Sequence, residues 1–220
     1  MGDLAIRERP QETSIVRQRI VVVTFGAIGA AVLAWGLRAQ PASGRFYIST
    51  FAVAVVWSAG GALAAPLHLG WHVRQAHLRR PVIAPIAVGA VLAAFFVVGA
   101  LVVRHVEPLA DRVEGVLAFA RHGSWPAVLS LTVANGIAEE VFFRGAVQPA
   151  LPQHIRLPGS VLIYAAVTMA TGNILLGLAA VLLGTIVGLQ RQATNGVLAP
   201  ILTHVTWSVS MLVALPLVFR

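Results

Sequence analysis

The chain has 220 residues, of which 58% are hydrophobic and only 11% are charged, and its mean hydropathy is +0.83. This composition excludes an ordinary soluble domain. All 16 basic residues are arginines and eight residues are acidic, which gives a net charge of +8. Cysteine is absent, which excludes disulfides, thiolate chemistry and cysteine-ligated zinc.

Apolar runs of about 20 residues recur along the chain, and this length crosses about 30 Å of hydrocarbon as a helix. The runs do not show the alternation that transmembrane β-strands require. The sequence therefore predicts an all-α protein, a polytopic transmembrane helical bundle of about seven spans, with six to eight compatible with the pattern. We expect it in a cell membrane of the bacterial cytoplasmic type.

The N-terminal part begins with a polar segment, residues 1–19, which predicts a cytoplasmic tail without a cleavable signal peptide. The region 20–124 is expected to hold three spans. Their approximate bounds are Ile20–Leu37, Phe46–Leu67 and Val82–Val103. The connection 104–124 is polar and predicts an amphipathic helix at the membrane interface.

The connection 68–81 is basic and contains His68, His72 and His77. These histidines have a spacing that metal sites use, but no acidic residue lies nearby in the sequence. We interpret the segment as a positively charged interfacial loop.

The region 125–220 is expected to hold four spans and the catalytic core. The first covers about Trp125–Ala150 and the last about Val197–Phe219. Between them, residues 158–190 are almost continuously apolar, and Thr171-Gly172-Asn173 predicts a break that divides them into two short spans.

Seven spans place the two termini on opposite sides of the membrane. The segments on the N-terminal side then hold nine arginines and those on the other side six. Because cytoplasmic loops carry an excess of positive charge, this distribution favours a cytoplasmic N-terminus.

Glu139 and Glu140 are the only acidic residues inside an apolar span. A charged side chain at the bilayer centre costs roughly 2.5–3.5 kcal/mol on insertion scales, so such a group indicates a functional site. On a helix Glu140 and Arg144 share a face and can form an ion pair, and Asn135 lies on one face with Glu139. One glutamate is thus held by an arginine, while the other is available as a general base for water.

Further polar groups follow in the later spans. His204 and Ser208 are four residues apart in the last span, and Asn173 lies at the predicted break. Together these side chains could donate hydrogen bonds to an oxyanion. The set predicts a hydrolase site with no metal, no cofactor and no nucleophilic side chain. The motifs H-E-x-x-H, G-x-S-G and G-x-G-D of other intramembrane proteases are absent.

The sequence Glu139-Glu140-x-x-x-Arg144 resembles the first motif of the CPBP (Abi) family of CAAX proteases and bacteriocin-processing enzymes, which are glutamic-type intramembrane endopeptidases. The segment 198–204, which ends at His204, resembles the third motif, and the resemblance covers about 125–212. It implies that Glu139 activates water, that Glu140 and Arg144 support it, and that His204 donates to the oxyanion.

The chain departs from the family pattern at two places. Met169 and Asn173 stand where the second motif, Phe-x-x-x-His, is expected, and Ser208 stands for the last asparagine of the third. At about 1.5 Å per residue, Asn173 comes out roughly 10 Å farther out than Glu139, a depth that Thr168 fits better.

The sequence therefore predicts an intramembrane endopeptidase that cleaves membrane-associated peptides or proteins. Its expected partners are such a substrate and the lipid bilayer, not nucleic acid, and the oligomeric state stays open. Two alternatives remain. The motif departures favour a catalytically impaired family member that binds or regulates another membrane protein, and the buried acids are compatible with a proton-coupled transporter.

Overall fold

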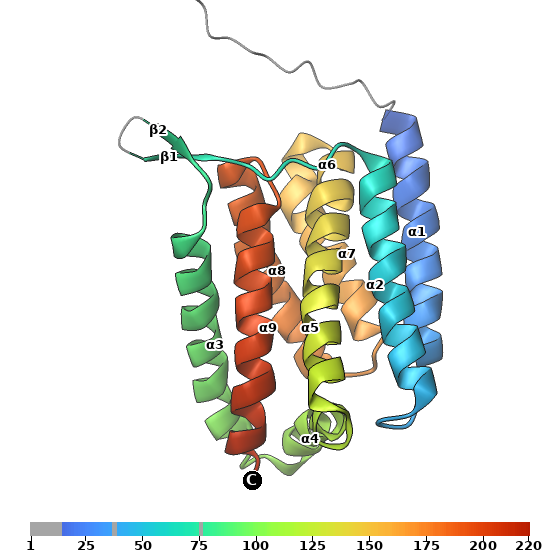
Figure 1. Ribbon diagram of the computed structural model, residues 1–220, viewed down its shortest axis with the longest axis vertical. Coiled ribbons are helices and arrows are strands. Elements are labelled where there is room, and N and C mark those ends of the chain that lie inside the picture. The colour runs from blue at the N-terminus through green and yellow to red at the C-terminus, as the bar shows by residue number, and fades with distance from the viewer. Residues whose placement is uncertain (1–14, 37–38, 75–76) are drawn as a thin grey trace, which may run out of the picture.

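The computed structural model describes residues 15–36, 39–74 and 77–220, which form a bundle of helices running up and down between two ends (Figure 1). Of the predicted tail 1–19, residues 1–14 lie outside this part of the chain. The outward faces of the helices carry large exposed apolar side chains, as in Phe51, Val91 and Leu162. Such surfaces are those that lipid covers, so the protein is a multi-pass membrane protein.

The first three long helices lie on two sides of the bundle: the first two pack together on one side, and the third lies on the opposite side (Figure 1). They are α1 (Ile15–Gly36), α2 (Gly44–Ala64) and α3 (Ile83–Val103). Ser43 caps α2 by accepting a hydrogen bond from the backbone N–H of Phe46.

The predicted amphipathic helix in the connection 104–124 is present as α4 (Glu107–His122), which lies across the lower end of the bundle in Figure 1. One face is apolar, since Leu117 packs with Ala100 and Phe219, while most of its charged side chains are exposed. This is the arrangement expected of a helix at a membrane surface.

The connection between α2 and α3 contains a short antiparallel hairpin that the sequence did not predict. Its strands are β1 (His72–Arg74) and β2 (His77–Arg79), and His72 pairs with Arg79. Strands of three residues are too short for a period-two pattern to be recognised in the sequence. The expectation of a plain loop was therefore wrong for these residues.

The central crossing runs without interruption over Trp125–Ala150. It begins as α5 (Trp125–Glu139), continues as a π-helical segment, η1 (Glu140–Val147), and ends in one α-helical turn, α6 (Gln148–Ala150). A π-helix of this length is rare, and π turns often occur at functional sites.

The predicted break at Thr171–Asn173 is confirmed. After a short 3₁₀ turn, η2 (Gln153–Ile155), the helix α7 (Arg156–Met169) ends at this break and α8 (Ile174–Thr194) begins directly after it. Gly172 has a φ of +73°, which favours glycine.

The last helix is α9 (Leu198–Val218). Six of the described helical crossings are long and apolar enough to span a membrane. The remaining crossing is α7, whose 14 residues extend only about 21 Å. With it the described chain passes seven times between the two ends, so the start of α1 and the C-terminus lie at opposite ends in Figure 1.

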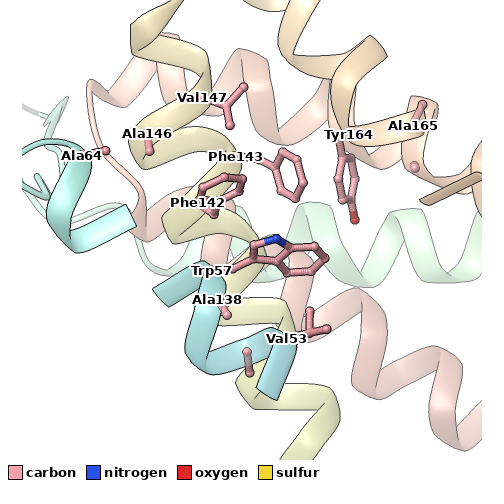
Figure 2. Close-up of a cluster of buried hydrophobic side chains, with 12 residues drawn as sticks. Val53, Trp57, Ala64, Ala138, Phe142, Phe143, Ala146, Val147, Tyr164 and Ala165 are labelled. Carbon is pink, nitrogen blue, oxygen red and sulfur yellow. The ribbon is translucent and has the colours of Figure 1, made fainter. Parts of the chain in front are cut away.

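An aromatic core connects α2 with the central crossing (Figure 2). Trp57 of α2 stacks on Phe142 at 6.4 Å and meets Phe143 edge-on at 5.4 Å. Phe143 in turn lies 4.8 Å from the ring of Tyr164 in α7. The core therefore continues directly into the residues around the two glutamates.

Candidate active site

The segment that carries the glutamates is enclosed by the rest of the bundle. Glu140 and Arg144 have no exposed surface, and neither have Phe143 and Ala146. A helix buried on nearly all sides must satisfy its polar side chains by contacts inside the protein.

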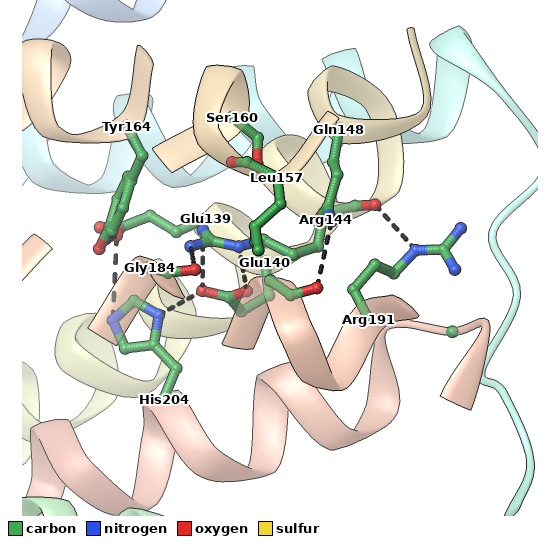
Figure 3. Close-up of polar contacts among 12 residues, drawn as sticks. Glu139, Glu140, Arg144, Gln148, Leu157, Ser160, Tyr164, Gly184, Arg191 and His204 are labelled. Atoms are coloured by element: carbon green, nitrogen blue, oxygen red, sulfur yellow. Dashed lines mark hydrogen bonds and ion pairs between the residues drawn. The ribbon is translucent and has the colours of Figure 1, made fainter. Parts of the chain in front are cut away.

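Glu140 is the centre of a buried ion cluster (Figure 3). Arg144 Nε lies 3.3 Å from one oxygen of the carboxylate, and its Nη1 donates to the other at 3.4 Å. His204 of α9 places Nδ1 2.7 Å from the same second oxygen. Because an ionised carboxylate only accepts hydrogen bonds, Nδ1 is the donor in this contact.

The arginine is also anchored to α8. Its Nη2 donates to the carbonyl of Gly184 at 3.2 Å, and four residues later Gln148 donates to the carbonyl of Gly188 at 3.1 Å. A Cβ on Gly184 would lie 3.1 Å from the arginine Nη2. The carbonyls of these two glycines thus accept the hydrogen bonds that join the central crossing to α8.

Glu139 has different surroundings. The hydroxyl of Tyr164 donates to its Oε2 at 2.6 Å, and His204 Nε2 lies 3.9 Å from the same oxygen. The side chain of Glu139 is 20% exposed, whereas that of Glu140 is not exposed at all. Glu139 is thus more exposed than Glu140 and His204.

The structure brings Glu139, Glu140, Arg144 and His204 together, as the sequence predicted. It does not bring Asn135 to Glu139, because the Asn135 amide donates to the carbonyls of Thr50 and Leu131. The neighbour expected on helical spacing is replaced by Tyr164 from another helix.

Asn173 lies outside this cluster. Its side chain caps α8 by accepting from Leu175 N, and it donates to the carbonyl of Arg112 in α4. It is a helix-end residue at the break, in keeping with the depth argument. Ser208 lies one turn from His204 on α9, is partly buried, and forms no hydrogen bond within the described part of the chain.

Tyr164 is the site residue that sequence reasoning missed. The second family motif is an aromatic residue followed four positions later by a polar one. Tyr164 and Thr168 have this spacing, five residues before Met169 and Asn173. Thr168 donates its hydroxyl to the Tyr164 carbonyl. Aligning the second motif with Tyr164 and Thr168, instead of with Met169 and Asn173, would have identified Tyr164.

The carboxylate of Glu139, which is partly exposed, and the imidazole of His204 face each other without a direct hydrogen bond. A separation of 3.9 Å between Glu139 Oε2 and His204 Nε2 is too long for a direct hydrogen bond. A water molecule or a substrate oxygen can bridge groups at such a separation. The arrangement can therefore hold an oxygen atom against His204 Nε2, beside the Glu139 carboxylate.

Residues 121–210 match the family model described as type II CAAX prenyl endopeptidase Rce1-like. The match contains both glutamates, Arg144, Tyr164 and His204. No curated protein and no solved structure matches the chain. The match agrees with the resemblance of the motifs to CAAX proteases, and it supports an intramembrane endopeptidase in general.

Proposed function

We propose that the protein hydrolyses peptide bonds of membrane-associated peptides or proteins, because residues 121–210 match the family model described as type II CAAX prenyl endopeptidase Rce1-like. The observation that supports this most directly is the difference between the two glutamates. One is enclosed and neutralised by an arginine, and its neighbour is accessible and faces a histidine.

In the proposed reaction Glu139 takes a proton from a water molecule while the water oxygen attacks the scissile carbonyl carbon. The carbonyl oxygen becomes an oxyanion, and His204 donates to it from Nε2. The tetrahedral intermediate collapses with cleavage of the C–N bond, and the proton held by Glu139 passes to the leaving amine. No covalent enzyme intermediate and no metal is required.

The donor role of His204 requires its imidazolium form, which donates from both ring nitrogens. Glu140 accepts from Nδ1 and so orients the ring with Nε2 toward Glu139. With Arg144 and the imidazolium, the two carboxylates form a set of four charges that sum to zero. Charge balance supports this form of the site within the membrane.

We assign the catalytic core to 125–220 and a supporting role to 20–124. Ser208 is proposed as a weaker second donor from α9, one turn beyond His204. Asn173 has no part in the proposed reaction, because its side chain is bonded to α4 and α8.

The test is the replacement Glu139→Gln, which keeps the shape of the side chain and removes the base. The purified protein in liposomes would be given two internally quenched peptides, one a farnesylated CAAX-type peptide and one an unprenylated hydrophobic leader-type peptide. We expect cleavage of at least one peptide to fall by about 10²–10⁴-fold, the usual contribution of general base catalysis.

The variant should retain the helical circular dichroism and thermal unfolding of the parent protein, because Glu139 is partly exposed and outside the buried ion pair. Cleavage at the parental rate by Glu139→Gln would refute the proposed function. Preference for one of the two peptides would identify the substrate class.

A further inference from the structure

Tyr164 makes the shortest polar contact of Glu139. Its hydroxyl donates to Oε2 at 2.6 Å, within the range of a strong hydrogen bond between a hydroxyl and a carboxylate. The other oxygen, Oε1, accepts no hydrogen bond from the residues that the structure describes. One carboxylate oxygen is therefore occupied by the phenol, and the other is free to take a proton.

The ring that carries this hydroxyl is fixed on both sides. The guanidinium of Arg144 lies 4.7 Å from the ring centroid, and the ring of Phe143 lies 4.8 Å away. Tyr164 itself is only 5% exposed. The same arginine that neutralises Glu140 thus also orients the tyrosine that binds Glu139.

The titratable and charged groups that face Glu139 come from three elements. They are Tyr164 of α7, His204 of α9, and Glu140 and Arg144 of the π-helical segment. Tyr164 is the only one of them hydrogen-bonded to Glu139, because His204 remains 3.9 Å away. The adjacent Glu140 disfavours a second negative charge, and the donor on Glu139 acts against this effect together with Arg144 and His204.

We propose that Tyr164 is a positioning residue for the base: its hydroxyl holds Glu139 ionised and directs Oε1 toward the attacking water. This inference rests on the proposed function. The phenol proton stays on Tyr164 throughout, since it is donated to Oε2 while the proton from water goes to Oε1. Arg144 then acts on both glutamates. It pairs directly with Glu140, and it contacts the ring of Tyr164, which donates to Glu139.

A buried tyrosine hydroxyl usually has a hydrogen-bond partner, so the contact could also serve packing alone. The two roles differ in what Tyr164→Phe changes. A packing role affects only stability. A positioning role also changes the pH at which Glu139 becomes protonated, because the ionised form loses its donor.

The test measures Glu139 directly by infrared difference spectroscopy of the full-length protein in liposomes. The carboxylic acid C=O band of Glu139 is identified by its loss in Glu139→Gln, and its intensity is followed against pH. In Tyr164→Phe we expect the midpoint to move to higher pH by about one unit, as the loss of a hydrogen bond to a charged group requires.

Tyr47→Phe is the matched control, because Tyr47 is the only other tyrosine and its hydroxyl accepts from Ser124 N at the far end of the bundle. This variant should leave the midpoint unchanged. Identical midpoints in Tyr164→Phe and the parent protein would overturn the inference, whether or not the peptides are cleaved.

The kinetic measurement separates the inference from the proposed function. In Tyr164→Phe the acid side of the kcat profile should move to higher pH by the same amount, with KM unchanged, and the rate below the parental midpoint should fall about tenfold. If Glu139→Gln is inactive and Tyr164→Phe has the parental pH profile, the proposed function stands and the inference fails. If Glu139→Gln stays active, the proposed function fails, and the infrared midpoint alone decides the role of Tyr164.

Discussion

Glu139 and Glu140 are neighbours in sequence and have opposite environments. Glu140 has no exposed surface and two basic partners, Arg144 and His204, whereas Glu139 is 20% exposed and accepts a hydrogen bond from a phenol. Different environments are how proteins give two adjacent carboxylates separate tasks. At the scale of single residues, this difference supports the proposal that Glu140 organises the site and Glu139 reacts.

The first prediction concerns the buried ion pair. Arg144→Met leaves the carboxylate of Glu140 without its guanidinium, and breaking a buried pair typically costs about 3–5 kcal/mol. We expect a marked loss of stability in thermal or SDS-induced unfolding in detergent. The double variant Glu140→Gln, Arg144→Met removes both charges and should regain part of the loss. Equal stability of the single and double variants would show that the pair is not coupled.

Helical spacing predicts contacts along one helix, and motif resemblance predicts His204 beside the glutamates, but the sequence misses other contacts between helices. Glu140 and Arg144 meet because they are four residues apart. Tyr164 meets Glu139 from another helix, and within its apolar run it has the appearance of an ordinary core residue. Asn135 shows the converse error, since helical spacing does not reveal that its amide donates to the Thr50 carbonyl of α2.

At the scale of elements, the π-helical segment is the feature that the sequence pattern does not show. Pro149 has no N–H and crowds the carbonyl of Gly145, which would be its i−4 partner in an α-helix. The wider turns of a π-helix relieve this contact. In a π-helix the carbonyl of Arg144 would accept from the N–H of residue 149, but Pro149 has none. Arg191 of α8 supplies that donor, with Nε 3.0 Å from the oxygen.

The π-helical segment also packs closely against α2. A Cβ on Gly61 of α2 would lie 2.6 Å from the carbonyl oxygen of Val141 and closer still to its side chain. Gly61→Ala must therefore push α2 away from the segment, and we expect a destabilisation of about 1–3 kcal/mol, as for other overpacked sites. The measurement is unfolding in detergent.

Gly99→Ala in α3 is the control for that variant. A Cβ there has no atom within 4 Å, so the replacement should be neutral or slightly stabilising. A Gly61→Ala protein as stable as Gly99→Ala would contradict the close contact between α2 and the π-helical segment.

At the scale of the whole molecule, hydropathy was sufficient to predict the long crossings. Local turn residues were sufficient to predict the break between α7 and α8. Thr171-Gly172-Asn173 ends α7 with a left-handed glycine and starts α8 with an asparagine cap, both of which are visible in the sequence. The hairpin at 72–79 was not visible. It depends on backbone pairing of six residues whose types also suit a loop.

The orientation of the bundle is a prediction that the absence of cysteine makes simple to test. Gln153→Cys lies on the η2 turn and Gly115→Cys on α4, at opposite ends of the central crossing, and both positions are exposed. The arginine distribution predicts that the η2 end is cytoplasmic. In intact cells, a membrane-impermeant maleimide should then label Gly115→Cys and not Gln153→Cys. The reverse pattern would invert the orientation.

The two hydrogen bonds from Arg144 and Gln148 to the carbonyls of Gly184 and Gly188 join helices at matching intervals of four residues. Adding or deleting one residue between the donors would rotate one side chain by about 100° relative to the other, so that both could no longer meet their acceptors. The same change in the connection 151–155, which lies outside both intervals, would leave them aligned. A change of length between these donors or between their acceptors would therefore break one of the two hydrogen bonds, whereas a change at the ends of the bundle would preserve both.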